Sequence, residues 1–179
     1  MEIVACNYPF LSIQKTQIKT QGFLDVQEIA RVKVNYAFNQ LKKPVVALDA
    51  GFYIDSLNGF PRAFVNFALE TIGLEGFIKL VEGKNKECEF RECLAYKDEN
   101  LSEPKFFISY VRGSLAYEKK GTMKDYLWSK LGLVFTPQGS KKTLAEMEKD
   151  EYLAWRSISR ERNSSARLFA SWLKLQNIF

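Results

Sequence analysis

Pro44-Val-Val-Ala-Leu-Asp-Ala-Gly-Phe-Tyr-Ile-Asp-Ser-Leu-Asn-Gly-Phe-Pro61 is the stretch that decides the fold. It opens with a short, β-branched apolar run, Val45 to Leu48, which predicts a buried strand. We expect this strand to end at one carboxylate, Asp49, because Gly51 follows it closely. A carboxylate at a strand end suits the crevice where α/β sheets bind ligands, although a solvated Asp that merely ends a strand fits the same pattern.

The length and composition favour one soluble domain. The 179 residues, 46% of them apolar, can bury one sizeable core, and no Gly/Ser/Pro-rich linker divides them. We therefore expect a single domain over residues 1–179. No apolar run is long enough to span a membrane, and the first residues lack the basic and then apolar layout of a signal peptide. These features predict a cytoplasmic protein.

The residue types restrict the possible chemistry. The three cysteines, Cys6, Cys88 and Cys93, are odd in number and lack Cys-x-x-Cys spacing, so they support neither a disulfide framework nor a zinc site. Histidine is absent, which leaves carboxylates for acid–base or metal chemistry. A bound metal should therefore be a hard cation such as Mg²⁺.

The charge balance is mildly basic. The net charge of +5, from 26 Lys+Arg against 21 Asp+Glu, permits nucleotide phosphates or nucleic acid as partners. Binding of nucleic acid is the weaker hypothesis, because no aromatic residues are interleaved with the C-terminal arginines.

Apolar spacing predicts further elements around the central stretch. Asp25 as N-cap and an apolar stripe predict a helix from Asp25 to Leu41, which Pro44 ends. The other expected elements are strands at 2–5, 10–13, 88–96, 105–111, 114–117 and 133–135, and helices at 63–70, 74–82, 143–158 and after Asn163 or Ser164. This order predicts an antiparallel meander added to an α/β start.

Four strings follow one another in a recognisable order: Glu28-Ile-Ala-Arg-Val-Lys33, then Leu48-Asp-Ala-Gly51 with Gly59-Phe-Pro61, then Thr71-Ile-Gly-Leu-Glu-Gly76, then Lys142-Thr-Leu-Ala-Glu-Met147. Together they resemble the inosine triphosphate pyrophosphatase family, whose members carry Glu-Asn-Ala-x-x-Lys, acidic-Asp-Ser/Thr-Gly and Gly-x-Pro motifs. The resemblance covers roughly residues 20–150. It implies an α/β fold with an elongated central mixed β-sheet flanked by helices.

The resemblance also implies a function. Members of the family cleave deaminated purine nucleoside triphosphates to a monophosphate and pyrophosphate with Mg²⁺, and they generally form homodimers. It implies that Asp49 is the catalytic carboxylate, that Asp49 and Glu28 hold Mg²⁺, and that Lys33 and Gly51 bind the substrate. The apolar residues of segment 60–68 are expected to form the dimer surface.

Three residues outside these motifs complete the expected substrate site. Arg160 and Arg162 are the best substitutes for the family's His-Arg pair, because guanidinium groups bind phosphate bidentately. Trp128 is expected to stack on the base, as the aromatic loop of the family does. The alternative to substrate binding is that these residues are solvated, or belong to the core or an interface.

Several departures leave the activity open. The family's Thr/Ser-Gly-Asn-x-x-Lys phosphate loop has only Asn7 in a similar context, so the N-terminus is expected to be shortened. Leu48 replaces the first acidic residue, Lys124–Gly132 replaces the base-recognition loop, and the Ser-His-Arg motif lacks its histidine. The alternative is a catalytically inactive relative that binds a nucleotide or a protein partner. These departures predict weak or absent hydrolysis with nucleotide affinity partly retained.

Overall fold

A computed structural model gives the structure of the chain; it describes residues 25–176, except for the side chain of Arg162. The strands are β1 (Val45–Ile54), β2 (Pro61–Arg62), β3 (Glu87–Lys97), β4 (Lys105–Leu115) and β5 (Phe135–Pro137). The helices are α1 (Val26–Leu41), α2 (Val65–Thr71), α3 (Gly73–Leu80), α4 (Lys149–Arg162) and α5 (Ser165–Leu175), with 3₁₀ helices η1 (Asp55–Leu57) and η2 (Lys130–Leu133).

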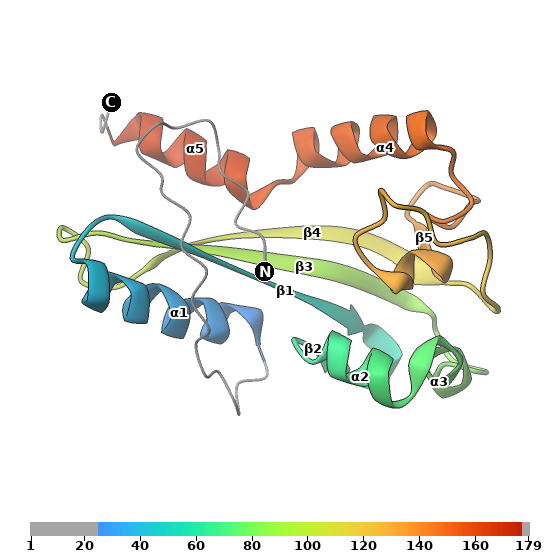
Figure 1. The fold of residues 1–179 in the computed structure, drawn as a ribbon. Helices are drawn as coiled ribbons and strands as arrows, with labels where there is room; N and C mark the ends of the chain where they lie inside the picture. Colours follow the sequence, from blue (N-terminus) through green and yellow to red (C-terminus); the bar gives the residue numbers. More distant parts are fainter. Residues whose placement is uncertain (1–24, 177–179) are drawn as a thin grey trace. The chain divides into compact units, whose positions relative to one another are not determined.

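In these residues the strands form one sheet in the order β2-β1-β3-β4-β5 (Figure 1). β1 pairs antiparallel with β2, and β4 pairs antiparallel with β5. The expected α/β fold with a helix-flanked central sheet is thus confirmed, while the mixed strand directions expected of the sheet do not appear in these two pairs. No helix in the described part of the chain has the length and apolar character needed to cross a bilayer.

The described residues divide into two compact units that share β1, β3 and β4. The first unit contains residues 25–50, 92–109 and 164–176, and the second contains 51–91 and 110–163. The single domain over residues 1–179 therefore stays a prediction, because each unit is compact in itself.

In the first unit, α1 and α5 lie on opposite sides of the strands (Figure 1). Asp25 caps α1 by accepting a hydrogen bond from the Gln27 N–H at 2.8 Å, as the sequence predicted. On the other side, Phe169 and Leu173 of α5 are buried in a cluster with the strand residues Leu94, Tyr96 and Phe107, and Val46, Leu48, Leu101 and Trp172 pack against it. Strand side chains alternate between two faces, so each helix covers a different set.

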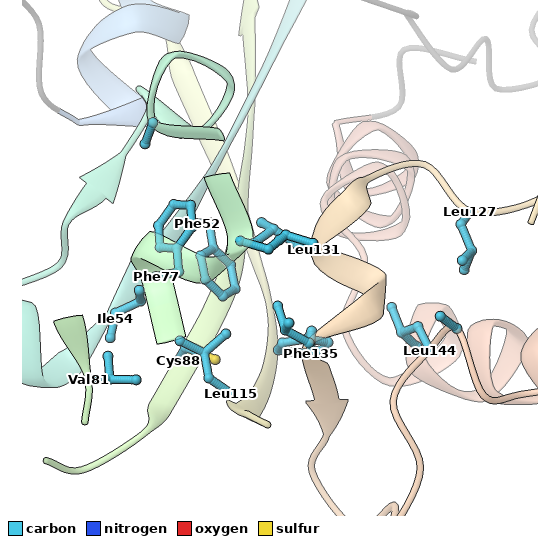
Figure 2. Close-up of a cluster of buried hydrophobic side chains, with 14 of the residues drawn as sticks. Phe52, Ile54, Phe77, Val81, Cys88, Leu115, Leu127, Leu131, Phe135 and Leu144 are labelled. Carbon is cyan, nitrogen blue, oxygen red and sulfur yellow. The ribbon is translucent and has the colours of Figure 1, made fainter. Parts of the chain in front are cut away.

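In the second unit the core is built around Phe52. Its ring lies 4.7 Å from that of Phe90, 6.1 Å from that of Phe135 and 6.5 Å from that of Phe77. Figure 2 shows Phe52 gathered with Phe77, Leu131 and Phe135, which come from separate parts of the unit. Tyr152 of α4 is fully buried in the same cluster. This core fixes the loop before η2 and the start of α4.

β1 differs from the expectation in one respect that matters for the site. It runs through Asp49 and Gly51 to Ile54, so the expectation that the strand ends at Asp49 is wrong. The reason is that Phe52, Tyr53 and Ile54 are buried and continue the strand beyond Gly51. Asp49 therefore lies in the middle of a strand.

Three other elements begin or end at residues that differ from those expected from the sequence. The two strands expected at 105–111 and 114–117 are one strand, β4, and at its Gly113 a Cβ would collide with the Thr136 carbonyl oxygen. Residues 130–133 form η2, and the strand expected at 133–135 is β5 at 135–137. α4 begins at Lys149 instead of residue 143, because Glu146 accepts hydrogen bonds from the Thr143 N–H and hydroxyl, which favour a turn there. The strands expected at 2–5 and 10–13 lie outside the described residues.

Candidate active site

The structure brings Lys33 and Asp49 together in the first unit. Lys33 lies on α1 and Asp49 on β1, and the ammonium nitrogen is 3.3 Å from Asp49 Oδ1. Both side chains are mostly buried, with 14% and 16% of their surfaces exposed. The Ala50 N–H also donates to Asp49 Oδ1 at 3.1 Å. The two residues expected to act together therefore form a shielded ion pair.

The two oxygens of Asp49 have different surroundings. Oδ1 accepts both hydrogen bonds, whereas Oδ2 is buried without a hydrogen-bond partner among the described residues. Burial raises the pKa of the Asp49 carboxyl above its ordinary value, and the Lys33 ammonium and the hydrogen bonds from Lys33 and Ala50 offset part of this effect. Oδ2 can accept a proton from water or coordinate a cation.

This arrangement suits a Mg²⁺ ion that the substrate helps to hold. Mg²⁺ usually takes one or two carboxylates together with waters and substrate phosphates. Asp49 Oδ2 is a buried carboxylate oxygen without a hydrogen-bond partner among the described residues, so it can serve as such a ligand. Within residues 25–176 no group of three Asp, Glu, Cys or His side chains forms a ready-made metal site. A cation at Asp49 would need ligands from the nucleotide.

The other expected residues of this part of the chain are placed as follows. Glu28, the second expected metal ligand, is exposed in the first turn of α1. It precedes Lys33 by five residues, so on a helix it points about 140° away from that side chain. Gly51 is buried in β1, two residues after Asp49.

A second cluster of candidate residues lies in the second unit around Trp128. This side chain is 48% exposed, and its ring meets that of Phe90 edge-on with 4.3 Å between centroids. The loop that carries it is tied down, because the Lys124 ammonium and the Tyr126 hydroxyl both donate to the Met147 carbonyl oxygen at 2.8 Å. Trp128 is thus a fixed, half-exposed aromatic surface.

α4 contributes a polar stripe to this cluster. Tyr152, Arg156 and Arg160 are spaced by four residues, which places them along one side of the helix. The Arg156 guanidinium lies 6.0 Å from the centre of the Tyr152 ring. Burial raises the pKa of the Tyr152 hydroxyl, and the charge of Arg156, a hydrogen bond with the Trp128 side chain and the charge of Arg160 oppose this. Arg160 is exposed, and the structure does not describe the side chain of Arg162.

Tyr152 was not among the residues expected at the site. A signal was present in the spacing Tyr152, Arg156 and Arg160, which aligns an aromatic residue with two cations on one helix face.

A polar groove of about 580 Å³ in the second unit is a weaker candidate. Two of its charged lining residues, Glu89 and Arg112, pair with each other, and Glu89 also binds Arg91. Its lining also includes Asp55, Glu87, Ser114, Thr136, Gln138 and Ser140. The groove includes neither Asp49 nor Trp128.

Comparison with known proteins connects these features to a family. The sequence model of the Ham1 family matches residues 4–169. The dITP/XTP pyrophosphatase of Saccharolobus solfataricus is 34% identical over 128 residues, which are 71% of this chain and 64% of that protein. The dITP/XTP pyrophosphatase of Methanopyrus kandleri is 33% identical over 150 residues, which are 83% of this chain and 75% of that protein.

A solved structure supports the fold. The Staphylococcus aureus Ham1 protein superimposes with a TM-score of 0.70 at 23% identity, over 94% of this chain and 83% of that chain. The family match covers most of the chain, and the matched range includes Lys33 and Asp49. The chain therefore belongs to the Ham1 family.

Proposed function

We propose that this protein is a nucleoside triphosphate pyrophosphatase that hydrolyses deaminated purine nucleotides of the dITP and XTP type. The observation that carries the proposal is the shielded pair of Lys33 and Asp49 with its unpartnered carboxylate oxygen. The names of the two archaeal relatives support the same activity.

In this proposal Asp49 acts on the attacking water. Its Oδ2 accepts the proton as the water oxygen bonds to the α-phosphorus, and the bond from that phosphorus to the pyrophosphate oxygen breaks. Lys33 holds Asp49 through Oδ1 and adds positive charge beside the polyphosphate. When bound, Mg²⁺ would offset charge on the phosphate oxygens, held by Asp49 together with the substrate. Glu28, the second expected ligand, is exposed and points about 140° away from Lys33 around α1, so its position does not support that role.

The remaining proposed contacts concern the rest of the substrate. Gly51 would let the backbone approach the nucleotide closely, because it has no side chain. Trp128 would stack on the base, and its half-exposed ring supports this role. Arg160 and Arg162 would contact phosphate.

The test is release of pyrophosphate across a panel of nucleoside triphosphates with Mg²⁺. We expect dITP and XTP to be cleaved in preference to ATP and GTP. Nucleotide binding without pyrophosphate release would instead identify the catalytically inactive relative that the missing histidine leaves open.

We also propose that the protein forms a homodimer through an apolar surface in the second unit. Phe60, Phe64 and Phe67 are 40%, 39% and 65% exposed. Large aromatic side chains that stay exposed close together in sequence favour a protein contact over solvent.

A further inference from the structure

The turn between β1 and β2 contains the pair Asn58-Gly59, and Asn58 is exposed to water. In an unfolded chain such a pair reacts spontaneously. The Gly59 amide nitrogen loses its proton to water and bonds to the side-chain Cγ of Asn58, which closes a succinimide ring and releases the side-chain nitrogen as ammonia. Water then opens the ring to aspartate or isoaspartate. Glycine favours the reaction because it has no side chain to hinder its nitrogen.

The folded turn holds this pair in a geometry that cannot react. Asn58 has a φ of 53° and a ψ of 35°, in the left-handed region. The ring requires the Gly59 nitrogen and the Asn58 Cβ to lie on the same side of the Cα–C bond. In an L residue this ψ places the two atoms nearly opposite each other. Ring closure therefore requires a large rotation of the Asn58–Gly59 peptide.

Hydrogen bonds hold both ends of that peptide. The Gly59 N–H donates to the Ile54 carbonyl oxygen at 3.0 Å, and the Arg62 guanidinium donates to the Asn58 carbonyl oxygen at 3.1 Å. Rotation of the peptide breaks both bonds together. The reaction at Asn58 must therefore wait until the turn opens locally.

Arg62 makes its hydrogen bond from a disfavoured backbone conformation. Its φ is 56°, and the other non-glycine residues with positive φ in the described part of the chain are Lys42 and Asn58. Those two are the C-caps of α1 and η1, where a left-handed residue is common, whereas Arg62 lies in β2. Gly59 leaves room for the guanidinium, because a Cβ there would lie 3.4 Å from Arg62 Nε. A disfavoured conformation in a strand indicates a task for the side chain.

We propose that Asn58 is a site of spontaneous deamidation that the β1–β2 turn keeps closed, and that Arg62 holds the peptide that must rotate. The reaction adds a carboxylate to the turn, and the isoaspartate product inserts Cβ into the main chain. The change falls two residues before the exposed Phe60. The inference concerns chemical ageing of the protein and does not depend on nucleotide hydrolysis.

The test measures how fast Asn58 is converted in mildly alkaline buffer, by peptide mapping with mass spectrometry. We expect the folded wild-type protein to react at least about tenfold more slowly than the same protein unfolded in urea, because reaction requires opening. Arg62→Ala keeps the left-handed backbone but loses the guanidinium. It should react about two- to tenfold faster than wild type when folded, the effect of one hydrogen bond, and at the wild-type rate in urea.

Asp25→Ala is the matched control, because it removes one hydrogen bond from the first turn of α1 in the other unit. Its urea midpoint should fall about as far as that of Arg62→Ala, while its rate at Asn58 stays at the wild-type value. Equal rates for folded and unfolded wild type would show that the turn gives no protection. A wild-type rate in folded Arg62→Ala, or equal acceleration in both variants, would overturn the role of Arg62.

Discussion

Leu48 and Asp49 are consecutive in β1, yet their side chains lie in different environments. Leu48 packs against the cluster of α5, whereas Asp49 pairs with Lys33 of α1. Neighbouring residues of a strand point to opposite faces, so an acidic residue at position 48 would face the apolar cluster. The apolar residue at this position therefore removes no ligand from the face that carries Asp49.

Leu48→Asp tests this relationship. The new carboxylate would be partly buried among apolar side chains, so we expect the free energy of unfolding to fall by about 2–3 kcal/mol. Affinity for Mn²⁺, used as a probe for Mg²⁺, should not increase. Leu48→Met is the control and should cost less than about 1.5 kcal/mol. Urea unfolding and Mn²⁺ titration by electron paramagnetic resonance give the two readings; tighter Mn²⁺ binding in Leu48→Asp would contradict the assignment of faces.

Asp49→Asn should abolish most of the activity while keeping the fold. The amide oxygen can still accept from Lys33 and Ala50, but the side chain can no longer take a proton or bind a cation as a carboxylate does. We expect turnover to fall about a hundredfold or more, the scale of a lost general base. Asp150→Asn is the matched control, because Asp150 is exposed in the first turn of α4. Equal turnover of wild type and Asp49→Asn would exclude the catalytic role.

Local signals in the sequence predicted the parts of the fold that depend on few residues. Asp25 and Pro44 bracket α1, and the capping hydrogen bond of Asp25 is present. The path of β1 was misjudged because Asp49 and Gly51 have the composition of a strand end. Only the burial of Phe52 in a core shared with α3 and β5 carries the strand onward. The sequence shows the apolar run from Phe52 to Ile54, but whether that run continues the same strand depends on long-range packing.

The candidate site could also be predicted only in part from the sequence. Family-like spacing placed Lys33 against Asp49, and the structure brings them together. The unpartnered Oδ2 of Asp49 could not be predicted from the sequence, because it depends on which neighbouring groups reach that atom. The ion-pair and hydrogen-bond partners of a side chain depend on how close the helices and strands lie in the folded protein.

The turn before α4 should make the protein more stable above the ordinary pKa of a glutamate. Hydrogen bonds from the Thr143 N–H lower the pKa of the Glu146 carboxyl. A lowered folded-state pKa means that the stabilisation is present above about pH 4.5 and is lost as the pH falls through the folded value. We expect Glu146→Gln to be less stable than wild type at pH 6.5 by at most about 1 kcal/mol, with the difference shrinking at pH 3.5. Urea unfolding at both pH values measures it, and a difference that grows at low pH would contradict the assignment.

The exposed phenylalanines of the second unit should control assembly. Phe67 on α2 is 65% exposed, so replacing it with glutamate should leave the monomer's core intact while placing a charge in the proposed contact. We expect wild type to scatter light as a dimer at micromolar concentration and Phe67→Glu as a monomer. Tyr117→Glu is the control, because Tyr117 is 82% exposed outside this surface. A wild-type monomer, or a Phe67→Glu variant that remains dimeric, would show that this surface does not hold two copies together.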